Sequence, residues 1–339
     1  TSATAAARSS AARTPSPALS PAPSRPPADA QPVRQLAAAV QLAAGDAGFS
    51  HRSCQLHEGC QLSAVHVRAW GARRDGARSV LLVHGYPDTS EVWRPVAERL
   101  ADAGRHVVAH DVRGAGRSPA PRTLAGYGME HLLDDLRSVV DEHAGGGPVD
   151  LVGHDWGSLQ GWPAAQGDAL GGRVASFTSI SGPGIDHLRP SPGQLLRSWY
   201  IGAFHLPGAP SLARAALGSS RFRSQLDAEG APTDATWPAP TLGADAKHGV
   251  GLYRANVLPR RLRPRPERLR IPVTMVVATR DRFVDPASID SAASWCDDVE
   301  RVEVDAGHWV IRSHPGEVAA IIERRSSRPA PAAPSPRAR

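Results

Sequence analysis

The stretch VDLVGHDWG, residues 149–157, decides the fold expected for this chain. It opens as a short apolar run, which predicts a β-strand buried on both faces. It continues as Gly153-His154-Asp155-Trp156-Gly157 into a segment with helical spacing. A small-x-acid-x-Gly sequence between a strand and a helix predicts a strained, sharp turn that lifts its middle side chain out at the top of a sheet.

Six further segments predict strands of the same sheet. Residues 79–85 form a continuous apolar run, whereas residues 61–71 alternate apolar and polar positions as a half-buried strand does. Helical spacing follows Ser90 and returns in residues 129–147. This alternation predicts an α/β fold with a mostly parallel, doubly wound sheet and a ligand site at the strand carboxyl ends. The strand segments are 61–71, 79–85, 106–111, 174–181, 271–279 and 299–305.

The alternation stops between residues 183 and 268, where Pro, Arg and short aromatic helical pieces predict an inserted, mainly helical lid. The core is therefore expected in two parts, 56–182 and 269–323. Residues 1–55 are rich in Ala, Pro, Ser and Arg, and residues 324–339 read RRSSRPAPAAPSPRAR. Such compositions predict two disordered tails, the second of them basic.

The basic charge is confined to these ends. The chain carries +6, of which residues 1–50 contribute +2 and residues 324–339 contribute +5, so the remainder carries −1. No nucleic-acid partner is therefore expected. No apolar run is long enough for a membrane span, and the three cysteines are too few for a disulfide scaffold, so we expect a cytoplasmic protein.

Four potential metal ligands, His51, Cys54, His57 and Cys60, recur at every third residue. Structural zinc sites usually take their ligands from two separate knuckles, with pairs two to four residues apart. We therefore interpret this segment as an irregular lead-in to the first strand and predict no metal site.

Asp155 taken alone could simply cap the helix that follows it, since Asp after a strand is a common N-cap. Three other motifs argue for a chemical role because they follow predicted strands in a fixed order. They are HGYP at 84–87, DVRGAGRS at 111–118 and AGHW at 306–309.

With these motifs, residues 60–323 resemble the epoxide hydrolase and haloalkane dehalogenase branch of the α/β-hydrolase superfamily. The similarity is greatest to the hydrolase half of proteins that fuse such a domain to a short-chain dehydrogenase, and we expect no dehydrogenase half here. The resemblance implies that Asp155 is the nucleophile, His308 the base that activates water, and Asp281 the carboxylate that orients His308. Asp285 is the alternative for the orienting role, although its place before Pro286 indicates a turn.

The resemblance also implies an oxyanion hole formed by the main-chain N–H groups of Tyr86 and Trp156. The residues expected to shape this loop and turn are His84, Gly85, Pro87 and His154.

Two tyrosines stand where the family carries its lid phenols. Tyr200 lies four residues before Phe204, which opens a motif resembling the family's aromatic-Gln-x-Pro-Gly segment with His205 in place of Gln. Tyr253 begins a Tyr-Arg-x-Asn piece, and the chain has only 4 tyrosines. Each could instead be packing in the lid, but a protonated phenol can donate to an opening epoxide oxygen.

The expected reaction converts a small-molecule epoxide and water to a 1,2-diol through an aspartyl ester, with no metal or organic cofactor. The particular epoxide and the oligomeric state stay open. One departure from the family pattern is Pro163, which predicts a short or kinked helix after the turn.

Three alternative functions remain. A haloalkane dehalogenase would use the same Asp, His and acid, with Trp156 as a halide-binding indole, but it usually lacks paired lid tyrosines. An esterase is disfavoured because Ser158 lies three residues beyond the nucleophile position. A non-catalytic, ligand-binding hydrolase fold would usually have lost a catalytic residue, and none is missing here.

Overall fold

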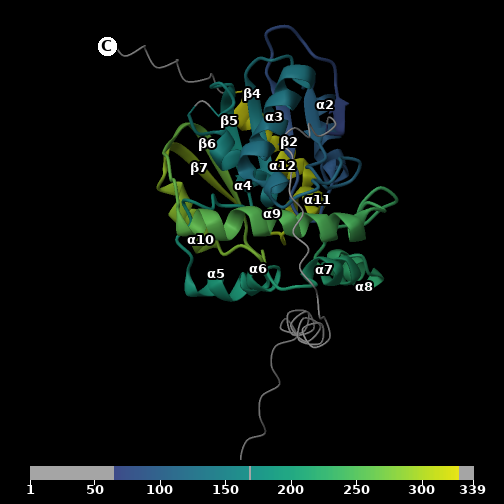
Figure 1. Cartoon of the computed structure of the whole chain (residues 1–339). Coiled ribbons are helices and arrows are strands. Elements are labelled where there is room, and N and C mark those ends of the chain that lie inside the picture. The colour runs from purple at the N-terminus through teal and green to yellow at the C-terminus, as the bar shows by residue number, and fades with distance from the viewer. Residues whose placement is uncertain (1–64, 168, 328–339) are drawn as a thin grey trace, which may run out of the picture.

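Seven strands form one sheet in residues 65–167 and 169–327, the part of the chain that the computed structural model describes. The order across the sheet is β1-β3-β2-β4-β5-β6-β7; β1 pairs antiparallel with β3, and the other neighbours pair parallel. Figure 1 shows β4, which precedes Asp155, within the body of the sheet. The strands are β1 (Val67–Trp70), β2 (Ser79–Val83), β3 (Val107–His110), β4 (Val149–His154), β5 (Val174–Ile180), β6 (Leu269–Ala278) and β7 (Cys296–Val304).

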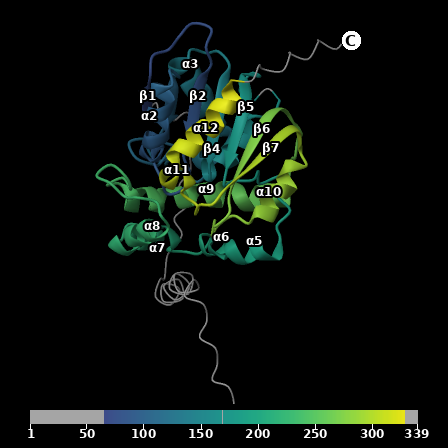
Figure 2. The ribbon, with the colours of Figure 1, turned by 180° about the vertical axis from the view of Figure 1, so that it is seen from behind.

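Helices cover both faces of the sheet, which explains the continuous apolar runs. In β2, Leu81 and Val83 belong to one core cluster, and Val80 and Leu82 belong to the other. The first cluster includes residues of α3 (Met129–His143), α4 (Trp156–Ala164) and α10 (Pro286–Ala293). The second includes residues of η2 (Ser90–Trp93), α2 (Arg94–Asp102), α11 (Val310–Ser313) and α12 (Pro315–Ser326), and Figure 2 shows α11 and α12 across the sheet.

Residues 183–268, called here the helical segment, contain no strand of the sheet. Figure 1 and Figure 2 show α9 crossing at one end of the sheet-bearing core, with α5 to α8 forming a further layer beyond it. The helices are α5 (Pro192–Arg197), α6 (Trp199–Ala203), α7 (Ala209–Leu217), α8 (Ser220–Ala228) and α9 (Leu242–Leu262). No helix within residues 65–167 and 169–327 is both long and apolar enough to cross a bilayer.

The α/β fold class predicted from the sequence is confirmed, and each of the seven expected segments overlaps one strand, although β6 and β7 begin two and three residues earlier than predicted. The helix after Asp155 is short, as Pro163 predicted: it ends at Ala164, and Pro163 lies in its last turn. The short 3-10 helix η3 (Ala125–Tyr127) precedes α3.

One predicted boundary needs correction. The basic tail was expected from residue 324, but α12 continues to Ser326. The reason is Arg325, which is almost fully buried and donates to the carbonyl of Val273 in β6. The metal-ligand pattern of residues 51–60 and the rest of both predicted tails lie outside the described residues.

Candidate active site

The turn after β4 holds Asp155 in a conformation that few residues adopt. Its φ is 50° and its ψ is −118°, a strained backbone that places the side chain between β4 and the start of α4. Glycine is required around it: a Cβ at Gly157 would overlap the Val83 carbonyl, and a Cβ at Gly85 would lie 2.5 Å from that of Asp155. The backbone at Asp155 is thus held by close packing of the turn against its neighbours.

The HGYP loop contacts this carboxylate directly. The Tyr86 N–H donates to Asp155 Oδ1 at 2.7 Å, and the Trp156 N–H also hydrogen-bonds the carboxylate. The loop is shaped by His84, whose Nε2 accepts from the Val112 N–H at 2.8 Å while its Nδ1 donates to the Gly85 carbonyl at 2.8 Å. The two main-chain donors therefore converge on Asp155, as expected of an oxyanion hole.

His308 lies between two carboxylates. Its Nδ1 is 2.9 Å from Asp281 Oδ2, and its Nε2 is 3.9 Å from Asp155 Oδ2. Burial alone would lower the pKa of His308, but the charge and hydrogen bond of Asp281, and then the charge of Asp155, raise it to about 9. Burial also raises the pKa of Asp155, against the opposing effects of His308 and the two N–H donors.

Asp281 is ionised although it is buried. Burial would raise its pKa, but His308 and the N–H groups of Phe283 and Val284 hold the pKa below its usual value. Those two N–H groups donate to Oδ1 at 2.7 and 3.0 Å, which leaves Oδ2 for His308. Asp285 instead precedes α10 and accepts a hydrogen bond from the Ser191 hydroxyl, so the geometry favours Asp281 for the orienting role.

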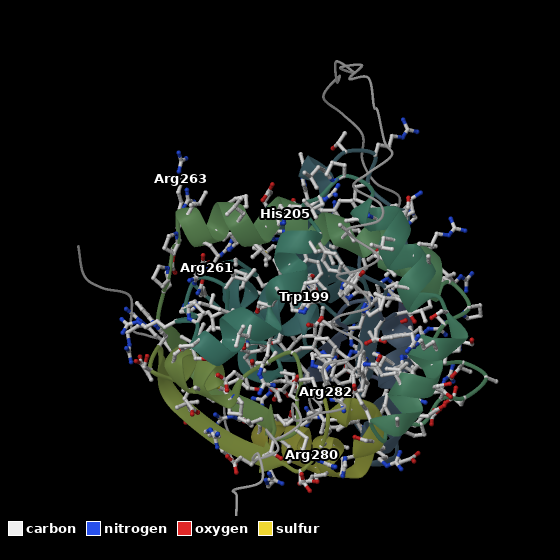
Figure 3. The ribbon with its side chains drawn as sticks, turned by 90° about the horizontal axis from the view of Figure 1, so that it is seen from below. Trp199, His205, Arg261, Arg263, Arg280 and Arg282 are labelled. Carbon is white, nitrogen blue, oxygen red and sulfur yellow. The ribbon has the colours of Figure 1, made fainter. Side chains whose placement is uncertain are left out.

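The two tyrosines meet over this centre from different helices. Tyr200 on α6 and Tyr253 on α9 have ring centroids 5.9 Å apart, and Tyr253 also packs edge-on against Trp156 at 4.9 Å. Burial is the main cause that raises the pKa of each phenol, and the Asp155 charge adds to it. Both hydroxyls therefore stay protonated near neutrality. His205, by contrast, lies on the outer surface in Figure 3 and hydrogen-bonds the Ile201 carbonyl.

Two other residues near the turn have packing roles. His154 is fully buried; its Nε2 donates to the main-chain oxygen of His308 at 2.9 Å, and burial lowers its pKa to about 3. Ser158 is also fully buried, with its hydroxyl 2.7 Å from that of Ser179 and 2.6 Å from the Gly182 carbonyl. A hydroxyl so placed cannot attack a substrate, which disfavours the esterase alternative.

A contact from the helical segment to the loop that carries Asp281 was not predicted from the sequence. On α5, Gln194 donates to the Phe283 carbonyl at 2.9 Å and accepts from the Asp285 N–H at 2.7 Å. One turn later, Arg197 donates to the main-chain oxygen of Asp281 at 2.6 Å. No motif marks these residues, because their partners are main-chain atoms that become neighbours only in the fold.

A second omission is Asp88, directly after HGYP. Its two carboxylate oxygens accept from the indole N–H groups of Trp237 and Trp309 at 2.8 and 3.0 Å. Burial raises the pKa of Asp88 to about 6, against these two donors. Trp309 follows His308 in the sequence, so its hydrogen bond to Asp88 fixes the chain beside the candidate base. The available sequence signal was that Asp88 directly follows HGYP and that Trp309 ends AGHW.

The chain is similar to known proteins of one fold family. A family model described as alpha/beta hydrolase fold matches residues 78–315. The chain is 37% identical over 281 residues to the probable oxidoreductase EphD of Mycobacterium tuberculosis, covering 76% of this chain and 47% of that protein. It is 36% identical over 154 residues to epoxide hydrolase A of the same organism, covering 43% of this chain and 46% of that protein.

The chain thus spans about half the length of the curated relatives it matches. Among solved structures, an epoxide hydrolase from Bacillus megaterium superposes with a TM-score of 0.67 at 22% identity, over 79% of this chain and 100% of that one. At this identity the similarity supports the fold alone. The family match extends from before β2 to the start of α12 and includes every motif of the site. The chain belongs to the alpha/beta hydrolase fold family.

Proposed function

We propose that this chain is an epoxide hydrolase that converts an epoxide and water to a 1,2-diol through an ester on Asp155. The observation that carries the proposal is the pair of protonated phenols, Tyr200 and Tyr253, packed together within the electrostatic influence of Asp155. The names of the relatives, which include epoxide hydrolases, agree with this reaction.

In the first step, one oxygen of Asp155 attacks an epoxide carbon and the ring C–O bond breaks. The electron pair of that bond moves to the epoxide oxygen, which takes a proton from Tyr200 or Tyr253. A second phenol beside the first can hydrogen-bond the tyrosinate that remains, because their rings are neighbours. The product of this step is a hydroxyalkyl ester of Asp155.

In the second step, His308 takes a proton from water, and the resulting hydroxide attacks the carbonyl carbon of the ester. The N–H groups of Tyr86 and Trp156 stabilise the oxyanion, which collapses and releases the diol oxygen from the ester carbon. The two protons of water then return to the diol alkoxide and the tyrosinate, so the centre is restored.

Ester formation also prepares His308 for this second step. In the free centre the negative charge of Asp155 contributes to raising the pKa of His308 to about 9. The ester carries no charge, so that contribution disappears, and the pKa of His308 falls toward the range in which the ring is a neutral base. We assign the helical segment, residues 183–268, the role of a lid that supplies the phenols.

One observation favours a second candidate, a haloalkane dehalogenase. The indole Nε1 of Trp156 is buried, and the hydroxyl of Tyr253 is the one acceptor that it meets in the described part of the chain. Such a donor could bind a leaving halide. Halide release from a chloroalkane, compared with diol formation from styrene oxide, separates the two activities.

The mechanism is tested by a single turnover in heavy-oxygen water with enzyme in excess over an epoxide. Attack of water on the ester carbonyl places the heavy oxygen in Asp155, where mass spectrometry of the peptide detects it. A first-turnover diol that carries all of the label would contradict the ester mechanism, because water would then have opened the ring directly.

A further inference from the structure

Large apolar side chains are exposed together on the helical segment. Of the seven large hydrophobic residues exposed in the described part of the chain, five lie in this segment, with exposed fractions from 42% to 77%. An isolated exposed leucine requires no explanation, but a group on one part of a protein often marks an interaction site. These five residues, called here the leucine face, are Leu195, Leu196, Leu206, Leu258 and Leu262.

Two of the five leucines lie on one side of α9, and a hydrogen bond places a third beside them. Arg254, Leu258 and Leu262 are spaced four residues apart, so they project from the same side of the helix. Arg254 donates to the main-chain oxygen of Leu206 at 2.7 Å, which brings the end of α6 next to that side of α9. Leu195 and Leu196 lie on α5, in the same outer layer beyond α9 (Figure 1).

The same segment is strongly basic. Residues 183–268 contain twelve Lys and Arg against six Asp and Glu, a net charge of +6, whereas residues 51–182 and 269–323 together carry −7. Acidic residues are absent from 187–226 and from 246–266, the stretches that carry the leucine face. Positive charge and apolar surface therefore occur together on one side of the molecule.

Two of the arginines at this surface are not paired with an acid in the described part of the chain, whereas Arg260 forms an ion pair with Asp186. Figure 3 shows Arg261 and Arg263 on one side of Trp199. Arg261 is exposed and donates to the carbonyls of Ile185 and Leu188, and no acidic partner of Arg261 or Arg263 occurs among the described residues.

We infer that the leucine face docks on the surface of a membrane containing anionic lipids. Such a surface has anionic headgroups above an apolar acyl layer. The leucines enter the acyl boundary, and the guanidinium groups of the arginines bind the lipid phosphates. A second copy of the chain fits less well: a symmetric contact would bring the arginines of both copies together, and the nearby Asp186 is already paired with Arg260. An acidic nucleic acid or peptide would leave the leucines unused.

The test is flotation of the full chain with vesicles of phosphatidylcholine alone or of phosphatidylcholine mixed with phosphatidylglycerol. We expect binding to the mixed vesicles only, weakened by salt. The double variants Leu195→Ser/Leu196→Ser and Leu258→Ser/Leu262→Ser should each reduce binding about tenfold or more, because leucine insertion is lost while every charge is kept. Val299→Ser, at an exposed valine on the edge strand β7 outside the helical segment, is the control and should bind as the unchanged chain does.

Circular dichroism and hydrolysis of a water-soluble epoxide establish that each variant is folded. Unchanged vesicle binding by both double variants would overturn the inference and assign the affinity to charge alone, including the basic chain ends. Sedimentation velocity covers the remaining outcome: a dimer that dissociates in the leucine variants, with no vesicle binding by the original chain, would assign the face to a second copy and also overturn the inference.

Discussion

The sheet-bearing core and the helical segment place their candidate groups by different means. In the core, main-chain geometry fixes Asp155: the strained turn and the Tyr86 N–H determine where its carboxylate lies. In the helical segment, Tyr200 and Tyr253 are positioned by ring packing on short or Pro-containing helices. Backbone placement tolerates little change, whereas ring packing can vary with the side chains around it. The candidate nucleophile and the candidate proton donors are therefore held by separate constraints in one site.

The largest effect is expected in the core. Asp155→Asn should lower kcat by at least ~10⁴-fold, because no other carboxylate is positioned to form the ester. His308→Gln should instead stop the reaction after ester formation. Intact-protein mass spectrometry would then detect one substrate mass added to the chain. If His308→Gln accumulated no ester while Asp155→Asn retained turnover, the assignment of the nucleophile would be wrong.

The helical segment should give an intermediate effect. Tyr200→Phe and Tyr253→Phe should each lower kcat by about 10–100-fold, and the double variant by about 10²–10⁴-fold, because either phenol can donate the proton while the other remains. Pre-steady-state kinetics of ester formation measures this step separately from hydrolysis. The control for packing is Phe222→Leu on α8, a conservative change of a ring that packs against Trp309 and not against the phenols. Equal rates of ester formation in the double variant and the unchanged chain would remove the phenols from the chemistry.

Substitutions on α5 test whether the helical segment helps to position the loop that carries Asp281. Gln194→Ala and Arg197→Ala should lower kcat by about 10-fold, because the loop carrying Asp281 loses contacts that hold it near His308. The same variants should shift the pH dependence of kcat that the titration of His308 produces. Simple loss of stability would not cause such a shift. Arg214→Ala, at an exposed arginine on α7, is the matched control. An unchanged pH profile would show that the core positions Asp281 without help from the helical segment.

The smallest effect is a pH dependence of stability. Because the pKa of His308 in the folded chain is about 9 and its ordinary value is 6.5, the folded state holds this proton more tightly than the unfolded state. The stabilisation is complete below about pH 6.5 and is lost as the pH rises through 9. We expect Tm to fall by a few degrees over that interval, and His308→Gln should remove this part of the fall. An equal slope in both proteins would contradict the raised pKa.

The sequence was sufficient for the fold because its signals are local. Apolar runs and the Gly-rich turn around Asp155 determine strand, turn and helix within a few residues, and each of the seven predicted segments overlaps a strand. The candidate residues were also named from motifs, and the structure brings Asp155, His308 and Asp281 together. Their chemical roles stay predictions.

The sequence was insufficient where partners are distant and unmarked. Gln194 and Arg197 bind main-chain atoms of residues more than eighty positions away, so no local pattern could identify them. The end of α12 was misjudged for a similar reason, since Arg325 is an ordinary tail residue by composition and is recognised as buried only through its contact with β6.

The hydrogen bonds that attach the helical segment to the core limit how molecules can enter and leave the site. Trp237 ties the helical segment to Asp88, Asp245 on α9 accepts from the Gly116 N–H at 2.9 Å, and Arg197 binds the Asp281 carbonyl. Three separated attachments oppose a swing of this layer about a single hinge. We therefore expect passage to the Asp155 carboxylate to use local side-chain rearrangement between the attachment points.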